Sequence, residues 1–187
     1  MTTKIIHFYG GPGSGKSTMA ASLFAMLKHG GHCAELVTEE VKKWAWTNRP
    51  VNPHDQLLIS STQTAAEISL LGKVDFIVSD APPRIALAYT KPDTAEYTAT
   101  ESIIKTYEAA TMCLDTYRYV VVRSKKYDTR GRYQTFEQAK EKDIQILGIL
   151  QDSYGNDFSV VKYSPTVLQE IYRAVTGTEY QGMWGDI

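Results

Sequence analysis

The sequence contains little cysteine, with only Cys33 and Cys113 among its 187 residues. The two lie far apart in the chain, outside any C-x-x-C pair, and neither has a histidine at metal-ligand spacing. This excludes the disulfide framework of small secreted domains and a cysteine-based zinc site. We expect two reduced thiols that are packed in the interior.

The chain also lacks an excess of charge of either sign and any long apolar run. Twenty Lys and Arg stand against 21 Asp and Glu, a balance that argues against a broad nucleic-acid surface but allows a local basic patch. A membrane-spanning helix needs about 20 apolar residues, and no run approaches that length. The apolar run that begins at Lys4 has about half a dozen residues, too few for a secretory signal. We therefore expect no membrane association and a cytoplasmic location.

Internal repeats, low-complexity tracts and linkers are absent as well. The 43% of hydrophobic and 22% of charged residues are typical of an ordinary globular domain. We expect one domain over residues 1–187, with a lid loop at about 124–134 and a loose tail at 178–187.

The most informative segment that is present is Gly-Gly-Pro-Gly-Ser-Gly-Lys-Ser-Thr at 10–18, which matches G-x-x-x-x-G-K-[ST]. A β-prone run at 4–9 precedes it and a helix-periodic segment at 18–28 follows it, which is the context of a true phosphate loop. The predicted nucleoside triphosphate site comprises Gly10, Gly11, Gly13, Ser14, Gly15, Lys16, Ser17 and Thr18. We expect Lys16 to reach the β- and γ-phosphates and the Ser17 hydroxyl to ligate Mg²⁺.

Apolar runs and helix-periodic segments alternate along the chain. We expect strands at 4–9, 32–38, 74–80, 117–123 and 158–162, and helices at 18–28, 39–46, 55–72, 96–116, 136–153 and 165–176. Thr38 is the expected cap of the helix at 39–46, and the two prolines at 82–83 predict an extended loop over 81–84. The alternation predicts an α/β fold, a five-stranded parallel sheet with helices on both faces.

Acidic residues follow two of these strands. Asp80 ends an apolar strand, where a phosphate-loop protein keeps its second Mg²⁺-organising acid. Glu39 and Glu40 leave the second strand at the same edge of the sheet, where a carboxylate can accept the proton of an attacking hydroxyl. Both glutamates also suit the start of a helix, so the sequence leaves open which one points inward.

A second informative segment is basic and runs from Arg123 to Gln134. It includes Lys125, Lys126, Arg130, Gly131 and Arg132. A loop of this kind at the carboxyl end of a strand can close over a triphosphate and neutralise the phosphoryl group during transfer. A solvated surface loop is the alternative.

These segments together resemble a family of phage and bacterial P-loop kinases that is similar to the ribosylnicotinamide and deoxynucleoside kinases. The resemblance covers residues 4–163 and rests on the phosphate loop, on Glu-Glu-Val-Lys-Lys-Trp at 39–44, on Val-Ser-Asp-Ala-Pro-Pro at 78–83, and on Arg-x-Lys-x-Tyr-x-x-x-Gly-Arg-x-Gln at 123–134. It implies ATP and Mg²⁺ as cofactors, Glu39 or Glu40 near the acceptor hydroxyl, and Arg123, Arg130 and Arg132 in the lid. Many relatives have Asp-Arg after the third strand, whereas three residues separate Asp80 from Arg84 here.

Three hypotheses remain for the phosphate acceptor. The first is the hydroxyl of a free nucleoside- or nucleotide-like molecule, with a ring stacked on an aromatic side chain such as Trp44, Trp46, Tyr89 or Tyr97. The second, implied by the same family, is a hydroxymethylated pyrimidine in DNA, which would place the protein in the cytoplasm of a phage-infected host. The third is no acceptor at all, as in an NTP-driven ATPase or switch.

Overall fold

The computed structural model describes residues 2–123 and 127–182. Within them a five-stranded sheet has the order β2-β3-β1-β4-β5, and every neighbouring pair is parallel. The strands are β1 (Lys4–Tyr9), β2 (Ala34–Val37), β3 (Phe76–Ser79), β4 (Thr116–Val121) and β5 (Ser159–Val161). The expected parallel α/β sheet is confirmed.

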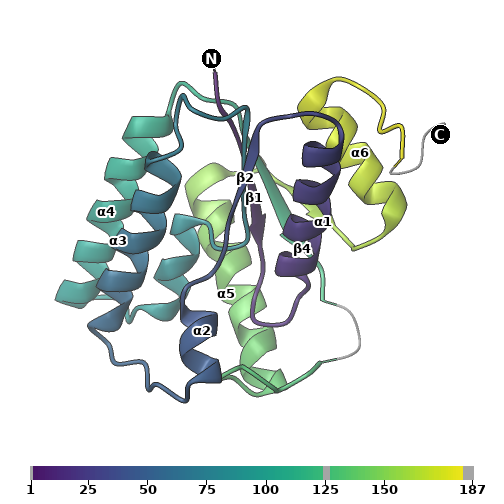
Figure 1. The fold of residues 1–187 in the computed structure, drawn as a ribbon. Coiled ribbons are helices and arrows are strands. Elements are labelled where there is room, and N and C mark those ends of the chain that lie inside the picture. The colour runs from purple at the N-terminus through teal and green to yellow at the C-terminus, as the bar shows by residue number, and fades with distance from the viewer. Residues whose placement is uncertain (1, 124–126, 183–187) are drawn as a thin grey trace.

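Helices cover both faces of the sheet (Figure 1). They are α1 (Lys16–His29), α2 (Val41–Trp46), α3 (Asp55–Ile68), the 3₁₀ helix η1 (Pro83–Tyr89), α4 (Ala95–Thr111), α5 (Phe136–Tyr154) and α6 (Pro165–Thr176). Helices α1 and α6 pack on one face, and α3, α4, α5 and η1 on the other. Among the described residues, none of these helices combines the length and apolarity needed to cross a bilayer.

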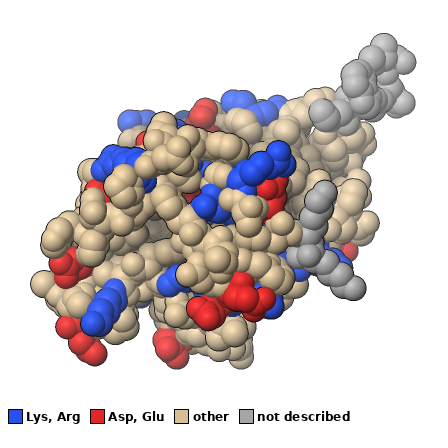
Figure 2. All heavy atoms as spheres, turned by 90° about the horizontal axis from the view of Figure 1, so that it is seen from below, with Lys and Arg blue, Asp and Glu red and all other residues tan. Residues whose placement is uncertain are grey.

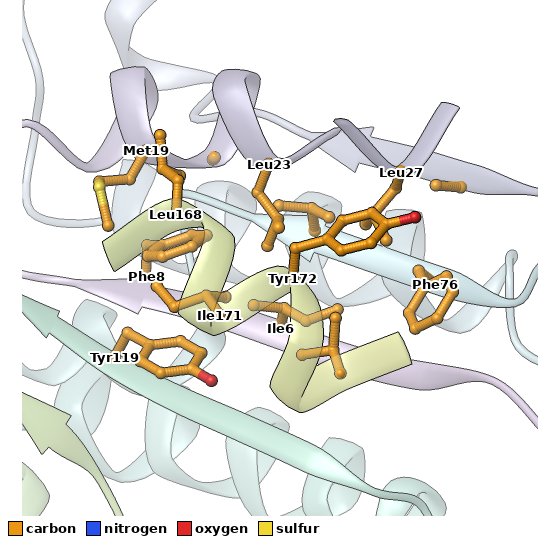
Figure 3. Close-up of a cluster of buried hydrophobic side chains, with 14 of the residues drawn as sticks. Ile6, Phe8, Met19, Leu23, Leu27, Phe76, Tyr119, Leu168, Ile171 and Tyr172 are labelled. Carbon is orange, nitrogen blue, oxygen red and sulfur yellow. The ribbon is translucent and has the colours of Figure 1, made fainter. Parts of the chain in front are cut away.

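Strand β1 is central in the sheet, between β3 and β4, and its side chains alternate between the two faces. Ile6 and Phe8 point into the core beneath α1 and α6, where the Phe8 ring stacks on Tyr119 with centroids 5.7 Å apart (Figure 3). Ile5 and Tyr9 point to the opposite face. The strand is thus buried on both sides, which fixes the position of the loop that follows it.

A buried polar cluster lies on the face covered by α3 and α4. His7 Nε2 lies 3.0 Å from the carboxylate of Glu67, and the Tyr107 hydroxyl donates to the same carboxylate oxygen. Glu67 is fully buried. Because a buried charge is stable only when it is paired, this cluster ties β1, α3 and α4 into one arrangement.

Three local expectations differ from the structure. Helix α2 begins at Val41 with Glu40 at its N-cap and no side-chain cap bond, so Thr38 is not the cap. The segment after Asp80 is not an extended loop, because Pro82 is extended and Pro83 then opens η1, where a missing N–H costs nothing.

The two cysteines are exposed rather than packed, since Cys33 precedes the edge strand β2 and Cys113 follows the end of α4. Within the tail expected at 178–187, the centroid of the Tyr180 ring lies 5.2 Å from that of Tyr172, and residues 183–187 lie outside the described part.

Candidate functional site

The phosphate loop lies between β1 and α1, at the carboxyl edge of the sheet. Gly10, Gly13 and Gly15 have φ values of 136°, 73° and 110°, which side-chain-bearing residues rarely adopt. A Cβ at Gly10 would also lie 2.6 Å from Ser14 Oγ. The loop can therefore keep this path only with glycine at these positions, and it directs the N-terminus of α1 toward the cavity described next.

A cavity of about 900 Å³ opens beside the loop. Its volume lies in the upper part of the range for ligand sites, about 300–1,000 Å³. Pro12 to Thr18 line one side, Glu39 and Asp80 line the carboxyl edge of the sheet, and residues of α2, α3 and η1 line the far wall. Seen from below, Lys and Arg are interspersed with Asp and Glu on this side of the molecule rather than forming one basic surface (Figure 2).

Lys16 lies inside this cavity and is buried. Its Nζ donates to the carbonyl oxygen of Gly11 at 3.0 Å. Burial lowers the pKa of the Lys16 ammonium, while the carboxylates of Glu39 and Asp80 act in the opposite direction. The ammonium is thus largely shielded from solvent, between the phosphate loop and the carboxylates of Glu39 and Asp80.

The two glutamates that the sequence left open differ in position. Glu39 lines the cavity, and its backbone N–H donates to Asp80 Oδ1 at 3.0 Å. Glu40 turns away and accepts from Lys43 at 2.8 Å in an exposed pair. Burial raises the pKa of Glu39, Lys16 opposes this rise, and Asp80 adds to it. Glu39 is therefore the glutamate with the environment of a proton acceptor.

The loop and its surroundings fit a nucleoside triphosphate and Mg²⁺. Ser14 Oγ is buried and has no hydrogen-bond partner within the described part of the chain, so it is free to meet a phosphate oxygen. Ser17 and Asp80 offer a hydroxyl and a carboxylate to the same cavity, and Mg²⁺ prefers one or two such ligands together with phosphate oxygens. The described residues include no cluster of three His, Cys, Asp or Glu side chains that would hold a metal alone.

The far wall contains two residues that the sequence analysis missed, Gln56 and Gln63 on α3. Both are almost fully buried and line the cavity. Ile59 lies between them on the same helix face, and Tyr89 of η1 faces the cavity with its pKa raised by burial. The sequence pattern that could have identified Gln56 and Gln63 is polar side chains at helical spacing on the inward face of a helix.

The arginines of the loop after β4 differ in burial and in pairing. Arg132 lines the cavity and its Nη1 is buried without a partner among the described residues. Arg130 also reaches the cavity, but it is exposed and paired with Asp128 at 2.6 Å. Lys125 and Lys126, expected in the lid, lie with Ser124 outside the described residues.

Two contacts join this loop to the segment around α2. Gly131 packs against the Trp46 ring, because a Cβ there would lie 2.6 Å from it, and the Tyr133 hydroxyl donates to the carbonyl of Arg49. The lid loop and the α2 segment thus meet over the cavity.

Arg123 takes a different place from the lid position that the resemblance implied. Its side chain is nearly buried and, unlike Arg132, is not among the described residues that line the cavity. It donates from Nε to Asp143 at 2.8 Å and from Nη1 to the carbonyl of Pro12 at 2.6 Å. Arg123 therefore contacts the outer side of the phosphate loop.

The four aromatic residues considered for ring stacking also differ in whether they line the cavity. Trp44 is buried beneath the guanidinium of Arg49, 3.5 Å from its ring centroid, and Tyr97 packs on the hydrophobic cluster of η1 and α4. Trp46 is 63% exposed beside the lid loop, and Tyr89 alone of the four lines the cavity.

Comparisons with known proteins agree with this fold. The chain is similar to the solved structure of the Mycobacterium tuberculosis APS kinase CysC in complex with AMPPNP and APS, at 13% identity and a TM-score of 0.53 over 95% of this chain and 99% of that one. It is also similar to the crystal structure of APE1195, at 16% identity and a TM-score of 0.49 over 95% and 96%. No curated protein matches.

At this level of identity the APS kinase shows a shared fold, which is that of P-loop kinases. A family model described as an AAA domain matches residues 5–169, most of the chain and the whole of the site. The protein belongs to this AAA domain family and has the fold of a P-loop nucleotide-binding protein.

Proposed function

We propose that the protein is an ATP-dependent phosphotransferase that moves the γ-phosphoryl group to a hydroxyl of a nucleoside- or nucleotide-like acceptor. The observation that carries the proposal is the composition of one cavity. A complete phosphate loop with Lys16 lies on one side, Glu39 and Asp80 lie at the carboxyl edge of the sheet, and a wall that includes the amides of Gln56 and Gln63 lies beyond them. A nucleotide hydrolase without an acceptor has no need of that wall.

The residues have distinct roles in the proposed reaction. The phosphate loop binds the triphosphate, and Lys16 and Arg132 offset the negative charge that develops on the phosphoryl group. Ser17 and Asp80 would hold Mg²⁺, which neutralises charge on the β- and γ-phosphates. Glu39 accepts the proton of the acceptor hydroxyl. The oxygen of that hydroxyl then bonds to the γ-phosphorus as the bond between this phosphorus and the β–γ bridging oxygen breaks, and ADP leaves.

The far wall supports this class of acceptor. Each amide of Gln56 and Gln63 offers a donor and an acceptor, and burial keeps the hydroxyl of Tyr89 neutral. Bases and nicotinamide carry donors and acceptors on one edge and a flat apolar face, which suits amides beside Ile59. The resemblance to ribosylnicotinamide and deoxynucleoside kinases supports the same class, and the APS kinase structure holds AMPPNP with a nucleotide-like molecule.

A hydroxymethylated base in DNA is a second candidate acceptor, and one observation favours it. Trp46 is 63% exposed and Tyr133 is 43% exposed near the opening of the cavity, where aromatic rings can stack on unpaired bases. The mixed charges on that side argue for a free nucleoside instead, because DNA binding depends on a basic surface.

The deciding experiment offers labelled ATP with Mg²⁺ to a panel of nucleosides, nucleotides, ribosylnicotinamide and DNA that contains hydroxymethyluracil. We expect label transfer to one class of acceptor, and slow hydrolysis without it. Lys16→Met should abolish transfer, whereas Lys28→Met, an exposed lysine on the same helix, should not. Fast hydrolysis that no acceptor changes would refute the kinase reading in favour of an ATPase or switch.

A further inference from the structure

A group of side chains behind the phosphate loop has no part in the reaction just described. Asp143 of α5 uses both carboxylate oxygens: Oδ1 accepts the backbone N–H of Gly11 at 2.6 Å, and Oδ2 accepts Nε of Arg123 at 2.8 Å. Arg123 in turn donates to the carbonyl of Pro12 at 2.6 Å and to that of Ala139 at 3.2 Å. Two consecutive residues of the loop are thus fastened to α5 by charge-assisted hydrogen bonds.

The contact is close enough to dictate the residue at position 11. A Cβ on Gly11 would lie 2.6 Å from Asp143 Oδ1 and 2.7 Å from the carbonyl of Ala139. Gly11 has no positive φ among the described backbone angles, unlike Gly10 and Gly13. Position 11 therefore needs glycine because α5 approaches it, and not because of its backbone conformation.

The same residue links α5 to the cavity. The N–H of Gly11 is held by Asp143, and its carbonyl accepts Nζ of Lys16 at 3.0 Å. A shift of this peptide would move the atom that orients the ammonium. Asp143 thus acts on Lys16 through Gly11, without touching the cavity itself.

Arg123 also contacts the base of the lid loop. Its guanidinium lies 5.4 Å from the Tyr127 ring centroid and 6.0 Å from that of Phe136, and these two rings are 5.5 Å apart. Tyr127 and Phe136 stand at either end of the described part of the loop. The Arg123–Asp143 ion pair therefore contacts both the phosphate loop and the two aromatic rings at the base of the lid loop.

We propose that Asp143 and Arg123 are positioning residues that hold Gly11 and Pro12 in the conformation that binds ATP. The proposal rests on the proposed function only through ATP binding, and not on the identity of the acceptor. It predicts that loss of the ion pair weakens nucleotide binding while the fold without nucleotide is retained.

The test compares Asp143→Asn, Arg123→Gln and the double variant. An amide retains the shape of Asp143 but loses the charge, and its NH₂ cannot accept from Arg123. We expect each single variant to bind AMPPNP about tenfold more weakly by calorimetry, and the double variant to bind no more weakly than either single one, because both remove one unit. Glu137→Gln, which removes only an exposed pair on the same helix, is the control and should bind like the wild type.

Unchanged AMPPNP affinity in the single variants would overturn the proposal, and so would strictly additive losses in the double variant. If a variant does not fold, amide exchange in the wild-type protein decides. The N–H of Gly11 should exchange more slowly than that of Gly13, which has no acceptor among the described residues. Equal exchange at the two amides would overturn the proposal. Binding of AMPPNP with no transfer to any acceptor would instead refute the proposed function and leave this inference standing.

Discussion

The choice between Glu39 and Glu40 gives the sharpest prediction for the proposed reaction. Glu39→Gln preserves the size of the side chain and the backbone N–H that Asp80 accepts, so the wall of the cavity should keep its shape. What it removes is the capacity to take a proton. Glu40→Gln, one residue further on, removes only an exposed pair with Lys43 and is a matched control.

The expected magnitude follows from the role. A positioned general base contributes about 10²- to 10⁴-fold to the rate. We therefore expect Glu39→Gln to lower kcat by that factor, or about 3–5 kcal/mol of barrier at about 1.4 kcal/mol per tenfold. The KM for ATP should stay level or fall, because the variant removes a negative charge near Lys16 and the phosphates. Glu40→Gln should change neither constant, since an exposed pair contributes about 0.5 kcal/mol to stability.

The pH dependence provides an independent check. Burial raises the pKa of Glu39, Lys16 opposes it, and Asp80 adds to the rise. A base works only when deprotonated, so kcat should fall as pH decreases through a value above the ordinary carboxyl range. This decrease of kcat at low pH should be absent in Glu39→Gln.

The assay is coupled ADP release with whichever acceptor receives label in the panel experiment, followed from pH 5 to 9. The reasoning is refuted if Glu39→Gln keeps near-normal kcat, or if Glu40→Gln shows the larger loss.

Three further predictions concern the metal, the lid loop and the core. Asp80→Asn should require more Mg²⁺ for half-maximal rate, because an amide keeps the shape but not the charge; identical Mg²⁺ titrations would assign Asp80 a structural role. Arg132→Ala should lower kcat more than Arg130→Ala, since Arg132 has a buried Nη1 without a partner among the described residues, whereas Arg130 is exposed and paired; equal kinetic losses would contradict this. Glu67→Ala leaves its buried partners unpaired and should cost about 3–5 kcal/mol, lowering Tm by about 10 °C in thermal melts. Glu101→Ala, at an exposed pair, should leave Tm unchanged, and a Tm loss for Glu67→Ala no larger than this would refute the role of the cluster.

The elements of this fold were predictable because strong local signals mark them. The phosphate loop has a complete motif, and α6 begins and ends as expected since Pro165 suits a first helical position and Gly177 ends the helix in the left-handed conformation. Asp80 was predictable for a similar reason: in a parallel sheet, an acid that ends an apolar strand must lie at the carboxyl edge.

The direction of side chains beyond the motif was not predictable from local pattern. Glu39 faces the cavity because its N–H meets Asp80, which lies far away in sequence. Arg123 has the sequence position of a lid arginine, but its contacts with Asp143 and Pro12 place it against the phosphate loop. Gln56 and Gln63 share the spacing of an inward helix face, but a glutamine on such a pattern reads equally well as a solvated residue.

The contact between Trp46 and Gly131 has a practical consequence. Indole emission responds to the polarity around the ring, and this indole is 63% exposed with one side covered by the lid loop. Opening of the loop would leave that side in water and shift the emission to longer wavelength. The other two tryptophans of the chain, Trp44 and Trp184, also emit, and the Trp46→Phe variant measures their contribution. The protein therefore carries its own optical reporter. A stopped-flow trace that compares the wild type with Trp46→Phe can test whether the loop moves when nucleotide binds, without any attached dye.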